Sequence, residues 1–214
     1  QNIYNFFLSE IQNFCLEGKS VFEVGCTAGG ILQLFKEKGA SIVEGIDLES
    51  DYVNYGKKKF SINIQTSSIY DYDNDKKYDI IILRHVLEHL SEPIKALKKV
   101  KNMLLDDGIL YVEVPSSFSM GIAKNMHANF IYYHPVIYSP QTLINTLQKS
   151  GLAKFSKNQL QRRSHMRLLA RKSNNKNSST SFKRENYMKV YLLYYLYHYT
   201  TFIRKIYYRS KLNV

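Results

Sequence analysis

The sequence predicts an α/β fold with a central, mostly parallel sheet and helices that cross over between its strands. Strand-like and helix-like patterns alternate along most of the chain, as they do where helices join parallel strands. Residues 78–83 form a continuous apolar run, which is typical of a parallel strand buried on both faces. Residues 20–24 are a further apolar run that leads through small residues directly into a helical pattern.

The elements of the amino-terminal half follow from these patterns in order. Residues 2–14 alternate apolar and polar positions as an amphipathic helix does, unlike a signal peptide. The strand at 20–24 precedes a helix at 30–38, which ends at Gly39 because glycine is the usual stop residue. The next predicted elements are a strand at 41–46, a polar helix at 51–60, a short strand at 62–66 and the buried strand at 78–83.

The carboxyl-terminal half adds helices and strands of the same kind. Ser91 is the predicted cap of a helix that has Pro93 in its first turn and extends to Gly108. Residues 139–140, Ser-Pro, start another helix in a similar way, and Gly151 ends it. The remaining predicted strands are 109–114, 153–156 and 167–171.

The predicted organisation is one catalytic-sized domain at residues 1–172, a polar linker at 173–181 and a basic, tyrosine-rich helical extension at 182–214. A chain of 214 residues can bury a sizeable core without a disulfide or metal. The linker is rich in Ser and Asn and has nothing to bury. Within the domain, residues 115–138 break the rhythm, so they form a predicted loop of the kind where function often gathers.

Positive charge is concentrated at one end of the chain. The net charge is +12, yet residues 1–152 contain 15 Lys/Arg and 17 Asp/Glu, a balance of −2. Residues 153–214 contain the other 15 basic residues and one acid, Glu185, a balance of +14. This asymmetry suits an anionic partner, such as a phosphorylated substrate, nucleic acid or an acidic membrane surface. The alternative is a solvated basic surface.

Cysteine usage and hydropathy indicate the compartment. Cys15 and Cys26 lie in no CxxC or Cys/His cluster, which argues for a reducing compartment such as the cytoplasm and against structural zinc. No apolar stretch approaches the ~20 residues of a membrane span. Residues 187–208 are aromatic on nearly every face, but basic residues interrupt them. This helix therefore packs on its own domain, joins two subunits as a homodimer, or lies peripherally at lipid headgroups.

The stretch FEVGCTAGGI, residues 22–31, carries the first chemical signal. A strand that ends in glycine brings backbone N–H groups close to a ligand, since a side chain at Gly25 or Gly29 would block the approach. Asp47 directly follows the second predicted strand, about twenty residues later, where a ribose-binding acid is expected. Nicotinamide and S-adenosylmethionine enzymes share this arrangement. Each signal has an alternative explanation. The turn needs small residues only for its own backbone shape, and Asp47 is a solvated acid that follows a strand.

Residues 78–117, YDIIILRHVLEHLSEPIKALKKVKNMLLDDGILYVEVPSS, separate these classes. They closely resemble the class I S-adenosylmethionine-dependent methyltransferases, which carry a "hVLEHl" segment after the fourth strand, a helix, a turn before G-x-L and a fifth strand ending in Pro. The resemblance spans about residues 18–171. It implies a Rossmann-like methyltransferase fold, with a mostly parallel seven-stranded sheet and helices on both faces. It also implies S-adenosylmethionine as the cofactor, with S-adenosylhomocysteine as its product.

The resemblance implies a set of cofactor contacts at the ends of the first four strands. The methionine end, the ribose, the adenine and the region near the methyl group are expected at Glu23, Gly25, Cys26, Gly29, Asp47, Leu48, Ser68, Ile69 and Arg84. Two positions depart from the family pattern. Thr27 replaces the middle glycine of the turn, which puts a close backbone approach there in doubt, and Ser68 replaces the more usual acid.

Residues 129–152 resemble the "H-x-x-x-x-S-x-x-x-L" stretch of the subgroup that methylates sugars and other small metabolites. The resemblance implies His134 as a base or acceptor-orienting residue, with His85 as a second catalytic candidate. Substrate contacts are expected at His127, Tyr132 and Tyr133. The alternative is that His85 packs at a helix start and that His134 only braces a lid.

The predicted function is methyl transfer to a small anionic or saccharide-linked acceptor, such as a sugar phosphate, a nucleotide-activated sugar or a surface-polysaccharide precursor. A nucleic-acid methyltransferase is one alternative, because the basic end supplies an electrostatic footprint. Val114-Pro115-Ser116-Ser117 stands where base-amino methyltransferases have an Asn/Asp-Pro-Pro-Tyr stretch, which counts against it. A nicotinamide-dependent oxidoreductase would need a hydride-transfer site that the sequence lacks. A non-catalytic cofactor-binding scaffold with an interaction tail is the third alternative.

Overall fold

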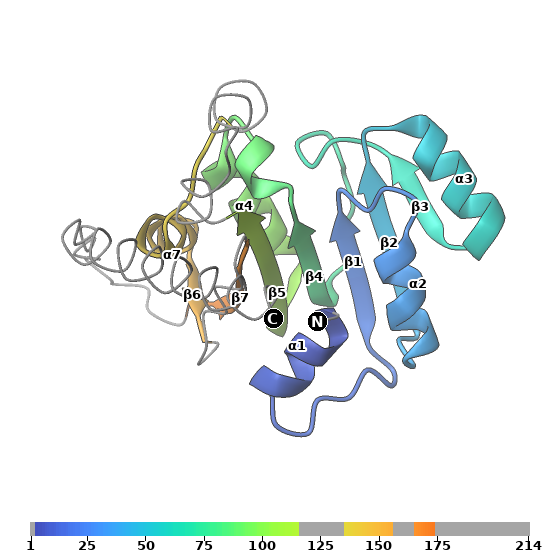
Figure 1. Cartoon of the computed structure of the whole chain (residues 1–214), viewed down its shortest axis with the longest axis horizontal. Coiled ribbons are helices and arrows are strands. Elements are labelled where there is room, and N and C mark those ends of the chain that lie inside the picture. Colours follow the sequence, from blue (N-terminus) through green and yellow to red (C-terminus); the bar gives the residue numbers. More distant parts are fainter. Residues whose placement is uncertain (1–2, 116–134, 156–164, 174–214) are drawn as a thin grey trace, which may run out of the picture. The chain divides into compact units, whose positions relative to one another are not determined.

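Figure 1 shows the computed structural model of the chain, which describes residues 3–115, 135–155 and 165–173. The chain divides into two units, Gln1–Ser181 and Phe182–Val214, and the second lies outside the described residues. The predicted tail helix therefore stays a prediction, as does most of the predicted loop and linker. Within the described ranges, no helix has the length and apolarity needed to cross a membrane.

Seven strands form one sheet in the order β3-β2-β1-β4-β5-β7-β6. The strands are β1 Ser20–Val24, β2 Ile42–Asp47, β3 Asn63–Thr66, β4 Tyr78–Arg84, β5 Leu104–Pro115, β6 Leu152–Lys154 and β7 His165–Lys172. The first five strands run parallel, whereas β7 is antiparallel to both β5 and β6. The predicted seven-stranded, mostly parallel sheet is confirmed.

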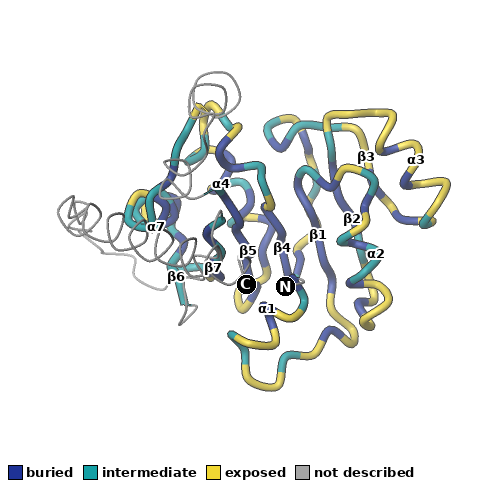
Figure 2. The backbone as a smooth tube through the Cα atoms, viewed as in Figure 1, coloured by how far each residue is buried: buried dark blue, intermediate teal, exposed yellow. Residues whose placement is uncertain are grey.

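Helices cover both faces of this sheet (Figure 1). They are α1 Ile3–Glu10, α2 Gly30–Glu37, α3 Ser50–Phe60, the short 3-10 helix η1 Leu87–His89, α4 Pro93–Met103 and α7 Pro140–Lys149. Apolar side chains of α1, α2 and α3 belong to one core cluster, and those of α4 and α7 belong to the other. Figure 2 shows the buried strands between these two layers.

The central strand β4 explains why its sequence is apolar without alternation. Ile80 and Ile82 lie in the cluster of α1 and α2, whereas Ile81 and Leu83 lie in the cluster of α4 and α7. All four side chains are at most 1% exposed. Successive side chains of a strand point to opposite faces, so a strand between two helical layers needs apolar residues at every position.

The two helices with Pro in the first turn begin differently. In α7 the Ser139 hydroxyl accepts a hydrogen bond from the Thr142 backbone N–H at 3.2 Å, so the predicted start is confirmed. In α4 the N-cap is Glu92 and not Ser91 as predicted, and its side chain makes no capping bond. The fixed backbone of Pro93 sets the start of α4 without a side-chain cap.

Helix α4 also ends earlier than predicted, at Met103 and not at Gly108. Leu104 is extended and fully buried, and it pairs with Tyr78 at the start of β4. Strand β5 therefore begins at Leu104, and its register with β4 shifts before the pairing resumes at Ile109. The sheet pairing of one buried leucine thus replaces the last predicted turn of the helix.

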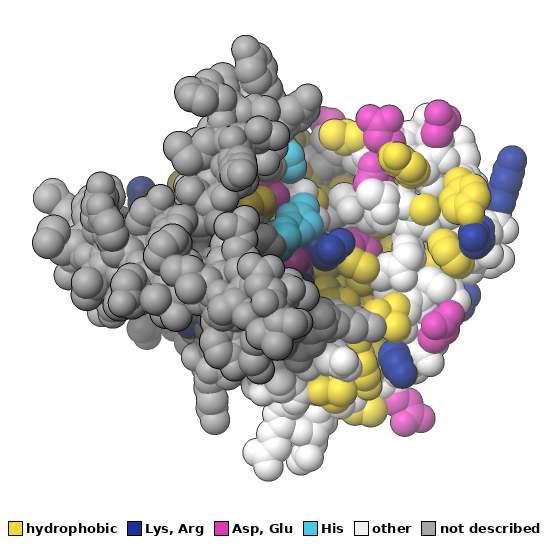
Figure 3. Space-filling view, viewed as in Figure 1, with side chains coloured by type: hydrophobic (Ala, Val, Ile, Leu, Met, Phe, Trp, Pro, Cys, Tyr) yellow, Lys and Arg dark blue, Asp and Glu magenta, His cyan; other side chains and the backbone are white. Residues whose placement is uncertain are grey.

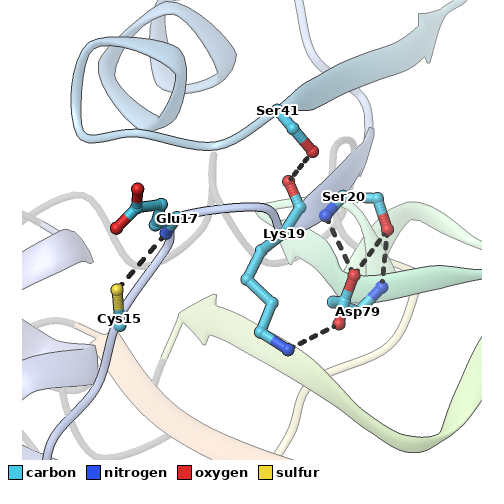
Figure 4. A network of polar contacts seen from close by, with 6 residues as sticks. All are labelled: Cys15, Glu17, Lys19, Ser20, Ser41 and Asp79. Atoms are coloured by element: carbon cyan, nitrogen blue, oxygen red, sulfur yellow. Dashed lines mark hydrogen bonds and ion pairs between the residues drawn. The ribbon is translucent and has the colours of Figure 1, made fainter.

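A polar network joins β1 and β4 at their amino ends (Figure 4). The Asp79 carboxylate accepts hydrogen bonds from the Lys19 ammonium at 2.9 Å, the Ser20 N–H at 3.0 Å and the Ser20 hydroxyl at 2.8 Å. The Ser41 hydroxyl donates to the Lys19 carbonyl at 3.2 Å, which brings the start of β2 alongside. The network aligns the starts of these strands, so their carboxyl ends meet at the opposite edge.

Candidate functional site

The glycine-containing turn lies at the carboxyl end of β1. Its N–H groups at Gly25 and Cys26 both donate to the Ile46 carbonyl of β2, at 2.8 and 3.0 Å. The N–H of Thr27 donates to the Asp47 carboxylate at 2.7 Å. Three consecutive N–H groups are therefore used inside the protein. These three groups therefore support the turn itself, and the expected contact of the turn with a ligand stays a prediction.

Small residues are needed in the turn for two structural reasons. Gly25 has a φ of +70°, and a Cβ there would lie 2.4 Å from Cγ2 of Val86. Thr27 has a φ of +48°, so it adopts the left-handed conformation that glycine adopts freely and other residues adopt at a cost of roughly 1–2 kcal/mol. Thr27 thus keeps the backbone shape that a glycine would supply at this departure from the family pattern.

The Asp47 carboxylate sits at the end of β2 beside this turn. One oxygen accepts the Thr27 N–H and the other accepts the Glu49 N–H at 3.0 Å. An ionised carboxylate has about four acceptor positions, so capacity remains for two hydroxyl groups. The next side chain, Leu48, is 70% exposed and offers an apolar surface beside the acid. Asp47 and Leu48 thus fit a ribose and the adenine attached to it.

Glu23 is the most unusual acid of this edge. It lies in β1 two residues before Gly25, it is 2% exposed, and its Oε2 atom has no hydrogen-bond partner among the described residues. Burial raises the pKa of Glu23 to about 8, although Arg84 lowers it in part. A buried carboxyl oxygen without a partner fits a ligand that brings a donor, such as the ammonium group of a methionine moiety.

Three further predicted cofactor residues, Ser68, Ile69 and Cys26, are less open. Ser68 donates its hydroxyl to the Asp71 carboxylate at 2.5 Å and accepts the Asp71 N–H at 3.1 Å. The side chain of Ile69 is buried in the core, so any contact from this residue to a ligand comes from its backbone. Cys26 is 2% exposed, and burial raises the pKa of its thiol, which stays protonated.

A charged row crosses three neighbouring strands near the same edge. Arg84 of β4 pairs in register with Glu113 of β5, which pairs with Arg167 of β7. Arg167 contacts the Glu113 carboxylate twice, at 3.1 Å through Nε and 3.3 Å through Nη2, and Arg84 Nε lies 3.6 Å away. The Tyr111 hydroxyl also donates to this carboxylate. These contacts, with His85, outweigh the effect of burial and lower the pKa of Glu113 to about 2.

His85 follows Arg84 in a left-handed conformation, with a φ of +55°. Its Nε2 lies 3.5 Å from Glu113 Oε1 and its Nδ1 lies 3.4 Å from Glu88 Oε1. Contact with Glu113 first, and with Glu88 second, raises the pKa of His85 to about 9. The ring is therefore cationic at neutral pH. It can act as a charge or a donor, but not as a proton acceptor.

His165 of β7 lies against His85, with 4.6 Å between the ring centres. One ligand atom each from His85, Glu113 and His165 lie within 4.8 Å of one another, a grouping of a kind that metal ions can use. The sequence predicted no metal site. Figure 3 shows histidine, basic and acidic side chains gathered near the centre of this face. Arg84 and Arg167 contact the same carboxylate and would compete with a metal ion for it.

Sequence reasoning missed Glu113, Arg167 and His165. The available signal was an acid inside the apolar strand 109–114, since such a residue needs a partner when buried. Four predicted acceptor residues, His127, Tyr132, Tyr133 and His134, lie outside the described residues and stay predictions.

Comparison with known proteins decides the family. Residues 3–157 match the methyltransferase domain family, which is more than half of the chain. The chain belongs to this family. The predicted Rossmann-like methyltransferase fold and the family's cofactor, S-adenosylmethionine, are confirmed with it.

Individual methyltransferases resemble parts of the chain. It is 30% identical over 108 residues to the ubiquinone biosynthesis O-methyltransferase of Haemophilus ducreyi, and this match covers 45% of each chain. It is 27% identical over 144 residues to the protein of the same name in Coxiella burnetii, and this match covers 64% of this chain and 56% of that one. The chain thus spans about half the length of the curated relatives it matches.

The fold is also shared with solved methyltransferase structures. Magnesium protoporphyrin IX methyltransferase from Synechocystis PCC 6803, with bound S-adenosylhomocysteine, superposes with a TM-score of 0.61. The match covers 74% of this chain and 76% of that chain at 19% sequence identity. At this identity the likeness concerns the fold alone.

Proposed function

We propose that this methyltransferase domain transfers a methyl group from S-adenosylmethionine to a hydroxyl oxygen of a small anionic or saccharide-linked acceptor. The observation that carries the cofactor half of this proposal is the buried, unpartnered oxygen of Glu23, two residues before Gly25. Asp47 holds the other side of the turn with acceptor capacity to spare. The two acids suit the methionine and ribose ends of one extended ligand.

The residues of the chain divide the work of this reaction. When bound, S-adenosylmethionine supplies a methyl group on a positively charged sulfur, which is a good leaving group. The chain then has to bind donor and acceptor in line, exclude water and accept the proton of the acceptor hydroxyl. His134 is the proposed base, because His85 is already cationic between Glu88 and Glu113.

Three features support the choice of acceptor. Relatives that match part of the chain are named O-methyltransferases, which favours oxygen as the acceptor atom. The charge of +14 in residues 153–214, fifteen basic residues against one acid, favours an anionic acceptor. The resemblance of residues 129–152 to sugar methyltransferases favours a sugar phosphate, a nucleotide-activated sugar or a polysaccharide precursor. Such an acceptor suits a cytoplasmic enzyme. The basic extension at residues 182–214 would then contact a second subunit or a membrane surface.

The test has a binding step and a transfer step. Calorimetric titration of the full chain with S-adenosylhomocysteine should show one binding event, and titration with NADH should show none. Transfer of labelled methyl from S-adenosylmethionine is then measured with sugar phosphates, nucleotide sugars and RNA as separate acceptors. His134→Ala should lower turnover while cofactor affinity stays nearly unchanged. Absence of cofactor binding by the folded chain would disprove the proposal, and transfer to RNA alone would replace its acceptor class.

A further inference from the structure

We propose that Arg84, His85 and Arg167 form an oxyanion-binding site for a phosphate or carboxylate group of the methyl acceptor, with Glu113 as their positioning residue. This inference rests on the proposed function, since it names the part of the acceptor that the domain recognises. Arg84 is among the cofactor contacts that the resemblance implies, and this inference assigns it to the acceptor instead. Glu113 and Arg167 belong to none of those contacts.

The sheet itself builds the site. Arg84, Glu113 and Arg167 occupy paired positions on three neighbouring strands, and their strand neighbours Ile82, Tyr111 and Leu169 all belong to the core cluster beside α1. Their side chains therefore point to one face of the sheet. Because β4 and β5 are parallel, the row lies at their carboxyl ends, the edge where open α/β sheets bind ligands.

Glu113 fixes the direction of the cations. Its carboxylate is 2% exposed and receives Arg167 through two nitrogen atoms and Arg84 through Nε. It also faces the His85 ring, and its backbone carbonyl accepts the His85 N–H at 2.9 Å. A guanidinium has five donors, so one contact to Glu113 leaves Arg84 with further donors for an oxyanion. The Arg84 side chain is 45% exposed, so a ligand can reach it.

The charge balance favours an anion. Arg84, Arg167 and His85 are three positive groups, and Glu113 is the carboxylate they share. Even when Glu88, which contacts the other side of His85, is counted, the basic groups outnumber the acidic ones by one. Planar guanidinium groups bind carboxylate and phosphate through paired, charge-assisted hydrogen bonds. The surplus charge and the donor geometry therefore suit an oxyanion.

A metal ion suits the same residues less well. It would need the Glu113 carboxylate, which Arg167 already binds through two contacts, and it would have to displace the proton of His85. Two guanidinium groups within about 4 Å of that carboxylate would repel a dication. An anion meets neither obstacle.

The test uses the full chain saturated with S-adenosylhomocysteine, with inorganic phosphate and acetate as separate probes. Binding is followed by calorimetry and, for phosphate, by ³¹P NMR. We expect Arg167→Gln to weaken anion binding by roughly tenfold or more, as expected for the loss of a charged hydrogen bond. Arg167→Lys keeps the charge but not the two-point contact. Its affinity for the anion should lie between those of the wild type and Arg167→Gln. Stronger binding of phosphate or of acetate identifies the anion class.

Arg171→Gln is the matched control, because this substitution removes the same charge from the same strand. The Arg171 side chain stacks on Phe155, away from Glu113. Glu113→Gln should weaken anion binding while affinity for S-adenosylhomocysteine stays within about twofold, whereas a merely structural role would change both. If Glu113→Gln unfolds, as thermal melting would show, the Arg167 variants still decide the question.

Several results would overturn the inference. These are equal weakening in Arg167→Gln and Arg171→Gln, no anion binding by the saturated wild type, or Zn²⁺ binding that depends on His165. Displacement of phosphate by S-adenosylhomocysteine would assign the cations to the cofactor's own carboxylate. Failure of S-adenosylhomocysteine to bind would remove the proposed function as well, whereas its binding without phosphate would remove this inference alone.

Discussion

The carboxylate of Asp47, at the end of β2, accepts a hydrogen bond from the backbone N–H of Thr27 in the turn after β1, at 2.7 Å. The acid that the sequence marks as a ribose ligand is therefore also a support of the turn. We therefore expect cofactor affinity and the local stability of the turn to be linked through this one side chain.

Asp47→Ala should consequently have two effects. It should weaken binding of S-adenosylhomocysteine by about 1–3 kcal/mol, because hydrogen bonds to hydroxyls are lost, and it should lower the melting temperature by freeing the Thr27 N–H. Asp47→Asn keeps one oxygen acceptor and should lose less of both. Calorimetry and thermal unfolding measure the two effects. Unchanged affinity in Asp47→Ala would remove Asp47 from the binding site.

Gly25→Ala tests the close packing of the turn. The new Cβ would lie 2.4 Å from Val86 at a φ of +70°, so we expect a loss of roughly 2–5 kcal/mol in the free energy of unfolding. Gly18→Ala is the control, since Gly18 has a φ of +73° but no atom within 4 Å of a new Cβ. It should lose only about 1 kcal/mol. Urea unfolding compares the two, and equal losses would show that Val86 does not restrict the turn.

Cofactor binding should release a proton from Glu23. Burial holds the pKa of this carboxyl at about 8, so it is largely protonated at pH 7, and a bound ammonium group would favour its charged form. Calorimetric titration with S-adenosylhomocysteine in buffers of different ionisation enthalpy should report release approaching about one proton. Glu23→Gln should abolish the release. The same proton count in both proteins would place the cofactor away from Glu23.

The stability of the chain should fall between pH 6.5 and 9 because of His85. Its pKa is raised from 6.5 to about 9 by Glu113 and Glu88, against burial and with His165 nearby. The stabilisation is fully present below pH 6.5 and is lost as pH rises through about 9. We expect a change of about 1–2 kcal/mol after solvent screening.

His85→Asn, which tolerates the left-handed backbone, is the variant for comparison. The difference in unfolding free energy between wild type and variant should shrink across this pH range. The raised pKa of Glu23 also lowers stability toward high pH, but it does so in both proteins and cancels in the difference. A difference that stays constant with pH would show that His85 is not held as a cation.

The sequence by itself determined the elements whose signal is local. The apolar run of β4 identified a strand with two buried faces, and the Ser-Pro pair at 139–140 identified the start of α7. Gly25 and Asp47, 22 residues apart in the sequence, meet at one edge of the sheet, since parallel strands bring their carboxyl ends together. A pattern of a few residues is enough to predict an element when each residue type is determined by its own burial or backbone conformation.

Only the tertiary structure decided what distant residues do together. The contact between Glu113 and Arg167 joins positions 54 apart, and it exists because β7 pairs antiparallel with β5 in one register. The early end of α4 depends in the same way on the pairing of Leu104 with Tyr78. A one-residue change of register would move every side chain of a strand to the other face. The ion pairs of Glu113, and its share in the charge of His85, thus follow from strand pairing, which no single segment of the sequence specifies.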